Sequence, residues 1–284
     1  MNCNLCPKKC NIDRKFSKGC CGESDKIKIA KYCLFELEEP CISGKNGSGA
    51  IFFSGCSLGC VFCQNYEISS MHYGKEISTK ELVNIFKELE SMGAENINLI
   101  SPTHFSSKII EALKIYKPSI PIVYNTHGYE SLETLKKLMP YIDVFLPDLK
   151  YVDNTLSKKY SGCADYFAVA SKAIKFMREN KQDVFEDGMI KQGVIIRHLI
   201  LPLCTYDSID VLRWIKENLP NTKVSLMAQY TPFGKISDYP EINRKITKRE
   251  YEKVVNAYLE LELDGYVQDR DSSGEKFIPT FKHT

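Results

Sequence analysis

The chain has 284 residues, of which 43% are hydrophobic and 26% are charged, and its formal net charge is +2. A chain of this length buries a sizeable core and forms one or two domains. The near-neutral balance gives no strong signal for nucleic-acid binding or for a membrane surface.

The expected compartment decides how the 12 cysteines are interpreted. No apolar stretch follows Met1. The most apolar segment, residues 193–203, is broken by Arg197 and His198 and is shorter than the roughly 20 residues that span a bilayer. We therefore expect a cytoplasmic protein without a membrane span. In a reducing cytosol, this many cysteines favour metal ligation or catalysis over a disulfide framework.

Residues 1–48 form a Cys- and Lys-rich segment without a clear period. Three of its cysteines, Cys3, Cys6 and Cys10, follow the spacing C-x2-C-x3-C, and a fourth, Cys21, lies downstream. Four thiolates complete a tetrahedral site, so the spacing indicates either zinc or an auxiliary Fe–S cluster. Cys20 is an alternative to Cys21 as the fourth ligand. We expect Cys33 and Cys41 to be free thiols.

The same segment is basic. Its cationic side chains are Lys8, Lys9, Arg14, Lys15, Lys18, Lys26, Lys28 and Lys31. Charge runs are most often a solvated surface. The alternative is a docking face for an acidic electron donor.

Short apolar runs alternate with amphipathic stretches along the rest of the chain. The runs are residues 50–54, 96–100, 120–124, 142–146, 193–201 and 223–227. They show little internal alternation, which suits strands buried on both faces of a parallel sheet. Helical patterns lie between them, and two begin at capping-box pairs, Ser78 with Glu81 and Thr247 with Glu250.

Six strand–helix units in a row favour a parallel α/β fold, and a full or partial barrel is its natural closure. A doubly wound open sheet is the alternative. In barrels the active-site side chains gather at the C-terminal ends of the strands. We expect a metal-binding extension at residues 1–48, the barrel at 49–235, and a C-terminal helix and tail at 236–284.

Three cysteines directly follow the first predicted strand with the spacing C-x3-C-x2-C. They are Cys56, Cys60 and Cys63. Three thiolates on one short loop ligate three irons of a 4Fe–4S cubane and leave the fourth iron open, as a catalytic metal requires. The amino and carboxylate groups of S-adenosylmethionine (SAM) suit that open position. A zinc knuckle is the alternative, but no fourth Cys or His lies in the loop.

This motif resembles the signature of the radical SAM superfamily. The longer string of residues 47–65 resembles the members described as pyruvate formate-lyase activating enzyme-like, and the resemblance continues at residues 125–129, 146–151, 196–202 and 226–232. It implies a partial (β/α)6 barrel with the Cys-rich segment as an N-terminal extension. It also implies an oxidoreductase that cleaves SAM to a 5′-deoxyadenosyl radical, with Phe62 near the adenine. The N-terminal cysteines recur in the same proteins.

Polar residues follow the second predicted strand. Radical SAM enzymes often have a Gly-Gly-Glu-like motif there, which meets the SAM amino group. This chain departs from that motif, because Ser101 and Thr103 occupy the position together with His104. Their hydroxyl and carbonyl groups are candidates for the same contact, while His104 is a structural residue, a proton donor or a ligand.

Three further strand ends supply candidates for SAM binding. Asn125 and Thr126 end the third strand, where the resemblance places the ribose or amino-acid part of SAM, although a turn explains them equally well. Asp148 and Lys150 match the activases' Asp-x-Lys and share one face of their strand. Arg197 interrupts an apolar strand, and a buried charge needs a partner. That partner is either an internal carboxylate or the carboxylate of SAM or of an anionic substrate.

Three functions are consistent with these residues. The first is an activase that abstracts hydrogen from a glycine of a glycyl-radical enzyme, although the pair of ferredoxin-type motifs carried by several activases is absent. The second is a radical SAM enzyme that modifies a small molecule or another macromolecule. The third is a non-catalytic metal-binding sensor or scaffold. The first two require a one-electron donor such as flavodoxin or ferredoxin.

Overall fold

Parallel strands in chain order form the centre of the sheet in the computed structural model, which describes residues 3–272 and residue 281. They are β2 (Ser48–Phe53), β4 (Ile97–Ile100), β5 (Ile122–Thr126), β6 (Val144–Pro147), β8 (Met189–Leu199) and β9 (Lys223–Met227). Each apolar run singled out in the sequence is therefore a strand, with somewhat shifted bounds. The side chains on the two faces of these strands are both mostly apolar, as expected for a sheet that is covered on both faces.

The sheet is an open barrel. Its order is β10-β9-β8-β6-β5-β4-β2-β1-β3, with β10 (Gly265–Val267) parallel to β9. At the other edge β1 (Ile27–Phe35) pairs antiparallel with β2, and β3 (Lys75–Ile77) pairs with β1, while β7 (Val184–Glu186) pairs with β8. The two edges do not pair within the described part of the chain, so the predicted partial α/β barrel is confirmed.

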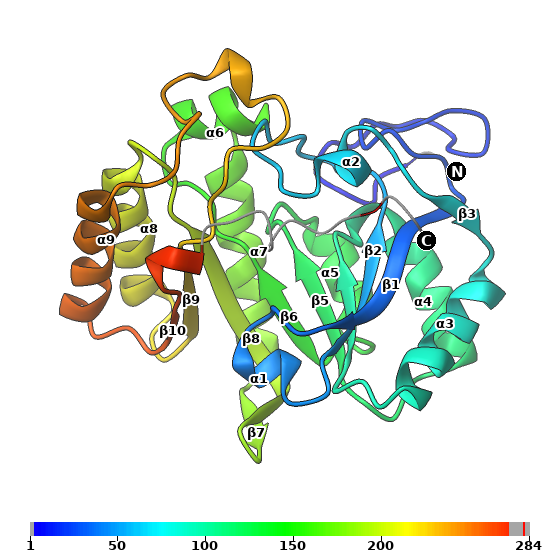
Figure 1. Cartoon of the computed structure of the whole chain (residues 1–284). Helices are drawn as coiled ribbons and strands as arrows, with labels where there is room; N and C mark the ends of the chain where they lie inside the picture. The colour runs from blue at the N-terminus through cyan, green and yellow to red at the C-terminus, as the bar shows by residue number, and fades with distance from the viewer. Residues whose placement is uncertain (1–2, 273–280, 282–284) are drawn as a thin grey trace.

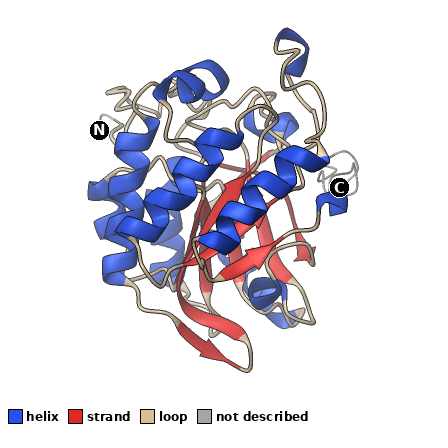
Figure 2. Cartoon of the chain, turned by 90° about the vertical axis from the view of Figure 1, so that its left-hand side faces the viewer, coloured by secondary structure: helices blue, strands red, loops and turns tan. Residues whose placement is uncertain are grey.

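Helices connect the strands and cover the outside of the sheet (Figure 2). The longer ones are α3 (Thr79–Ser91), α4 (Ser106–Ile115), α5 (Leu132–Leu138), α7 (Tyr166–Asn180), α8 (Thr205–Asn218) and α9 (Lys248–Glu260). The shorter ones are α1 (Pro40–Ser43), α2 (Tyr66–Ser69) and α6 (Asn154–Ser161), with single 3-10 turns η1 (Thr103–Phe105), η2 (Ile236–Asp238) and η3 (Arg270–Ser272). Both predicted capping boxes are present, so the starts of α3 and α9 follow directly from the sequence.

The core lies on both faces of the sheet because side chains alternate along each strand. Ile51 and Phe53 of β2 pack in the main core with Phe86 of α3. Ala50 and Phe52 point the other way, into a smaller cluster. Full burial of one such side chain contributes roughly 1.5–3 kcal/mol. This packing holds the strand ends, and therefore the residues that follow them, in fixed positions.

The segment between β1 and α1 crosses the open side of the barrel. Figure 1 shows it running in front of the sheet from β1 to α1, which packs against β8. This crossing brings residues 36–39 beside strands that lie far from them in the sequence. None of the described helices is long and apolar enough to cross a membrane. The structural description stops within the tail that we expected at residues 236–284, because residues 273–280 and 282–284 lie outside the described part.

Candidate functional site

A cavity of about 180 Å³ lies at the C-terminal ends of the parallel strands. The predicted site residues that line it are Cys56, Cys60, Phe62, Cys63, Ser101, Asn125, Thr126, Asp148, Lys150 and Arg197. The fold therefore brings together the cysteine loop after β2 and polar residues from four other strand ends. Thr103 does not line the cavity.

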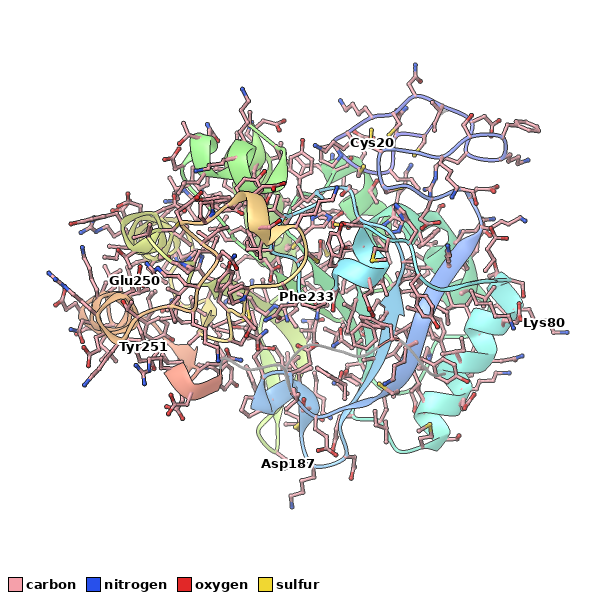
Figure 3. The ribbon with its side chains drawn as sticks, turned by 45° about the horizontal axis from the view of Figure 1, so that its top comes forward. Cys20, Lys80, Asp187, Phe233, Glu250 and Tyr251 are labelled. Carbon is pink, nitrogen blue, oxygen red and sulfur yellow. The ribbon has the colours of Figure 1, made fainter. Side chains whose placement is uncertain are left out.

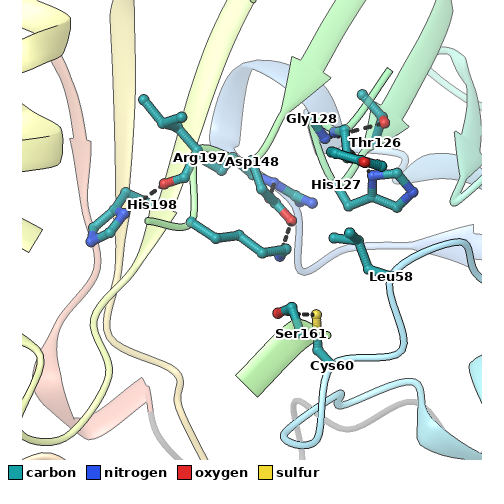
Figure 4. A network of polar contacts seen from close by, with 12 residues as sticks. Leu58, Cys60, Thr126, His127, Gly128, Asp148, Ser161, Arg197 and His198 are labelled. Atoms are coloured by element: carbon teal, nitrogen blue, oxygen red, sulfur yellow. Dashed lines mark hydrogen bonds and ion pairs between the residues drawn. The ribbon is translucent and has the colours of Figure 1, made fainter. Parts of the chain in front are cut away.

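Each sulfur of the cysteine loop faces a hydrogen-bonding group of the protein. The hydroxyl of Ser161 lies 3.0 Å from Cys60 Sγ (Figure 4), and the hydroxyl of Ser69 donates to Cys63 Sγ at 3.3 Å. The backbone N–H of Leu58 donates to Cys56 Sγ at 3.5 Å. Such donors favour the thiolate form that ligates iron.

The three thiols also lie close enough to influence one another. Burial, together with the neighbouring Cys60 and Cys63, raises the pKa of Cys56 to about 12. Burial and Cys60 also raise the pKa of Cys63. Iron ligation removes these protons outright. The donor set therefore fits a cubane cluster, which distributes its ligands over separate irons.

No three His, Cys, Asp or Glu side chains among residues 3–272 and 281 are arranged to hold one metal ion. This observation concerns a single ion and therefore gives no support to a zinc ion at either group of cysteines. The ligands of a cubane each bind a different iron and so stand further apart than the ligands of one zinc ion.

His127 fixes the cysteine loop to the end of β5. Its Nδ1 accepts the backbone N–H of Tyr129 at 3.1 Å, so the proton of the neutral ring is on Nε2. Nε2 lies 2.9 Å from Ser57 Oγ, next to Cys56. Burial lowers the pKa of His127 to about 3, so the ring stays neutral. His127 follows Thr126 directly, but no pattern in the sequence assigned it a role.

A buried network of charges forms one wall of the cavity (Figure 4). Arg197 Nε donates to Asp148 Oδ1 at 3.1 Å, and Arg197 Nη2 donates to Asn125 Oδ1 at 2.6 Å. Lys150 Nζ donates to the second Asp148 oxygen at 2.6 Å. Burial would raise the pKa of Asp148, but Lys150 and Arg197 outweigh it and hold that pKa below its usual value. Arg197 therefore has the internal carboxylate partner that the sequence left as one of two alternatives.

Glu38 completes this network from the N-terminal side. Its Oε2 accepts from Arg197 Nη1 at 3.1 Å, and its Oε1 accepts from Asn98 Nδ2 at 3.0 Å and from Asn125 Nδ2 at 3.2 Å. Burial raises the pKa of Glu38 to about 7, although Arg197 opposes the shift. Sequence reasoning did not find Glu38, because no local pattern indicates that residues 36–39 cross the barrel.

The two threonines of the predicted SAM site share a buried carboxylate. The hydroxyls of Thr103 and Thr126 both donate to Glu130 Oε1. Glu130 Oε2 is buried and has no hydrogen-bond partner among the described residues. Burial raises the pKa of Glu130 to about 7. The hydroxyl protons of Thr103 and Thr126 are thus directed away from the cavity.

Two further predicted residues meet the cavity in different ways. Ser101 has a left-handed backbone, with φ of 57°, and its N–H donates to the carbonyl of Asn125 at 2.9 Å. Such a backbone is costly for a residue with a side chain and is concentrated at functional sites. The ring of Phe62 packs edge-on against Tyr230, with 6.0 Å between the ring centres. Phe62 also lines the cavity.

The N-terminal cysteines gather in a compact turn-rich segment. A side chain at Gly19 would lie 3.4 Å from Cys21 Sγ and 3.6 Å from Cys10 Sγ, so these two sulfurs face the same point. Burial, with smaller contributions from Glu130, Cys21 and Cys10, raises the pKa of Cys6 to about 12. Cys21 is buried, whereas the alternative ligand Cys20 is exposed. The backbone N–H of Cys20 donates to Cys10 Sγ at 3.2 Å, and a side-chain hydrogen bond with Cys10 raises the pKa of the Cys20 thiol.

Arg14 is a buried cation beside these cysteines. Its guanidinium donates to the backbone carbonyls of Glu23, Ser24 and His104. It lowers the pKa of Cys21 against the larger effect of burial, which raises it. A buried cation held by carbonyl groups is costly without a nearby anion, and thiolates at Cys21 and its neighbours would supply that anion.

Comparison with known proteins places this geometry in context. The sequence profile described as the radical SAM superfamily matches residues 50–202. An uncharacterised protein of Methanocaldococcus jannaschii is 29% identical over 276 residues, which are 93% of this chain and 76% of that protein. A pyruvate formate-lyase-activating enzyme of Clostridium pasteurianum is 25% identical over 223 residues, which are 74% of this chain and 86% of that enzyme.

Solved structures share the fold at lower identity. SuiB of Streptococcus suis, bound to S-adenosylmethionine, has a TM-score of 0.54 and 17% identity, and the match covers 75% of this chain and 48% of SuiB. Methylornithine synthase (PylB) has a TM-score of 0.51 and 16% identity, with 74% of this chain and 63% of PylB covered. This chain therefore spans about half the length of SuiB.

Proposed function

This chain belongs to the radical SAM superfamily, and from that premise we propose that Cys56, Cys60 and Cys63 hold a 4Fe–4S cluster at which SAM is reductively cleaved. The observation that carries the proposal is the shared cavity, which is lined by three loop thiols and by a network of buried charges. A bound cluster and SAM supply one-electron cleavage of the sulfonium and a carbon radical that abstracts hydrogen.

The charged wall has unused capacity for a polar ligand. Lys150 uses one of its three N–H donors on Asp148, and Arg197 uses three of its five on Asp148, Glu38 and Asn125. We infer that the remaining donors of Lys150 and Arg197 bind the carboxylate or ribose hydroxyls of SAM. Asp148 orients both cations, because it contacts each with a different oxygen.

The other cavity residues complete the binding site that we propose. Phe62 offers an aromatic face for the adenine, and Ser101 and Asn125 offer polar groups from adjoining strand ends. Thr126 lines the cavity, but its hydroxyl donates to Glu130 and accepts the N–H of Gly128 at 3.3 Å. We infer that Thr126 shapes the site, and that Thr103 acts only by holding Glu130.

We further propose that the radical acts on a glycine of a partner glycyl-radical enzyme. The relative from Clostridium pasteurianum, described as a pyruvate formate-lyase-activating enzyme, supports this proposal. The edges of the barrel are also unpaired, so its open side is not closed by strands, although residues 36–39 cross it (Figure 1). The second candidate is modification of a small molecule, which the likeness in fold to methylornithine synthase favours.

Cys3, Cys6, Cys10 and Cys21 form a second metal centre in this proposal, with either zinc or an Fe–S cluster. The converging sulfurs of Cys10 and Cys21 support it, as does the buried cation of Arg14 beside Cys21. Four thiolates around a divalent ion carry a net negative charge, which Arg14 partly offsets. A low-potential carrier such as flavodoxin or ferredoxin would be the reductant of the SAM cluster.

The decisive experiment is anaerobic SAM cleavage with dithionite, in the presence of a candidate glycyl-radical enzyme labelled with deuterated glycine. We expect 5′-deoxyadenosine that contains deuterium, together with a glycyl doublet in the EPR spectrum. Deuterium transfer from a labelled metabolite, with no glycyl radical, would instead establish the small-molecule function. A protein that holds its clusters but cleaves no SAM would be a sensor or scaffold, and the proposal would be wrong.

A further inference from the structure

The N-terminal segment presents a basic outer surface. Lys9, Lys15 and Lys18 are exposed, and Phe16 between them is 87% exposed. We call these four residues the lysine face. Within the described part of the chain, none of the three ammonium groups is in an ion pair with a carboxylate. Asp13 interacts electrostatically with Lys15, so the charge of this surface is partly offset there. An exposed aromatic ring is a common feature of protein-binding surfaces.

This segment is attached directly to the cysteine loop. The backbone N–H of Cys56 donates to the carbonyl of Cys21 at 3.3 Å. The preceding residue, Gly55, has φ of 84°, and a side chain there would lie 2.7 Å from that carbonyl and 2.5 Å from Glu23 Cγ. Only glycine permits so close an approach. The backbone of the lysine-bearing segment therefore contacts that of the cluster-binding loop.

Two polar links hold the segment in this position. Arg14 donates to the carbonyl of His104, and His104 Nε2 lies 2.6 Å from the carbonyl of Ser54, just before Gly55. Glu23 Oε1 lies 2.9 Å from His72 Nδ1, in the loop after α2. Arg14, Cys21 and Glu23 thus attach the segment that carries the lysine face to the loops around Cys56. Figure 3 shows Cys20, from the same segment, on the outer side of these loops.

We propose that the lysine face is the docking site for an acidic one-electron carrier protein that reduces the cluster at Cys56, Cys60 and Cys63. The inference rests on the proposed function and names the partner surface of that site. The carrier transfers one electron to the cluster. The carrier is thereby oxidised by one electron and the cluster is reduced by one electron, and no atom is transferred. Opposite charges increase the rate of encounter, and electron-transfer complexes need only a small interface.

An acidic protein fits this face better than a nucleic acid does. The chain has a net charge of only +2, and the face carries few cations, whereas a polyanion is held by many phosphate contacts. The ring of Phe16 suits the apolar centre of a protein interface. The contact between Cys21 and Cys56 supplies the reason for this location, because an electron carrier must approach the cluster closely.

The test uses the holoprotein and flavodoxin. The variant Lys9→Glu/Lys15→Glu/Lys18→Glu is compared with Lys80→Glu/Lys114→Glu/Lys136→Glu, which changes three exposed lysines on α3, α4 and α5 by the same charge. Titration calorimetry measures flavodoxin binding at low and high salt, and stopped-flow absorption measures cluster reduction by flavodoxin and by dithionite. Equal cluster content in both variants shows that they fold.

We expect the lysine-face variant to bind flavodoxin at least tenfold more weakly and to be reduced by it at least tenfold more slowly, with unchanged reduction by dithionite. The control variant should stay within twofold of the wild type. Flavodoxin binding and reduction equal to wild type in the lysine-face variant would overturn the proposal. The proposal would also be overturned if the lysine-face variant lost binding to duplex DNA while its flavodoxin binding and reduction were unaffected. Failure of the wild type to cleave SAM with dithionite would instead refute the proposed function.

Discussion

Arg197 Nη1 lies 3.1 Å from Glu38 Oε2, although the two residues are 159 positions apart. Both side chains are largely buried, with exposed fractions of 15% for Arg197 and 7% for Glu38. The contact joins the segment after β1 to β8 and closes one wall of the cavity. It couples the N-terminal part of the chain to the candidate SAM site.

We predict that Glu38→Ala destabilises the protein, because it leaves the buried Arg197 with one carboxylate partner instead of two. The free energy of unfolding should fall by about 2 kcal/mol. Urea titration monitored by circular dichroism measures it. The matched control is Glu76→Ala, whose exposed ion pair with Lys26 should contribute less than about 1 kcal/mol. Equal losses in the two variants would contradict a structural role for the Glu38 contact.

The sequence predicted the part of the site that depends on strand ends. Asp148, Lys150 and Arg197 could be found because parallel strands deliver their C-terminal residues to one edge. Glu38 could not, since its position depends on the crossing of residues 36–39 over the barrel. The strand before it begins with a short alternation, in which Ile27 and Ile29 are buried around Lys28. This alternation indicates a strand, but not that the segment after it crosses the barrel.

The threonines show a second limit. Thr103 was a candidate for its hydroxyl or carbonyl group, and Thr126 was a candidate from the resemblance to the activases. In the structure Glu130 accepts both hydroxyl protons. A sequence indicates that a polar group lies near a strand end, but not which neighbour satisfies it. That assignment depends on the turn after β5, which brings Glu130 within hydrogen-bond distance of both threonines.

Stability should depend on pH through Glu130. Folding raises its pKa from 4.5 to about 7. Its stabilising contribution is therefore fully present below pH 4.5 and is lost as the pH rises through about 7. The loss should reach about 3 kcal/mol, and Glu130→Gln should abolish it. Urea unfolding of the metal-free protein at pH 5 and pH 8 measures this difference. Glu133→Gln, an exposed change on α5, is the control, and a variant Glu130→Gln that follows the wild-type pH profile would refute the assignment.

Asp148→Asn should weaken SAM binding more than Lys150→Gln does, because Asp148 orients both Lys150 and Arg197. We expect an affinity loss of roughly 100-fold for the first variant and roughly 10-fold for the second. Equilibrium dialysis with labelled SAM measures both, and unchanged visible absorption confirms that the cluster remains. Lys80→Gln, on the exposed side of α3, is the control. Wild-type affinity in both variants would assign the network a purely structural role.

The N-terminal metal centre should be independent of the SAM cluster. A Cys56→Ala/Cys60→Ala/Cys63→Ala variant should retain one centre, and metal analysis of that variant identifies it as zinc or iron. Adding Cys6→Ala and Cys21→Ala should remove the remaining metal. Cys33→Ala, added to the triple variant instead, is the control and should not change the metal content. Absence of both zinc and iron from the triple variant would refute this centre.

The hydroxyl of Ser161 should tune the reduction potential of the cluster. It lies 3.0 Å from Cys60 Sγ and 3.0 Å from the hydroxyl of Tyr151. A hydrogen bond to a ligating sulfur stabilises the more negative, reduced state, so Ser161→Ala should make the potential more negative by roughly 40 mV, the equivalent of about 1 kcal/mol for one electron. EPR-monitored redox titration measures the shift. The control is Ser157→Ala on the same helix, whose hydroxyl donates to the carbonyl of Asn154 and contacts no sulfur. If the two variants have the same potential, the Ser161 contact does not act on the cluster.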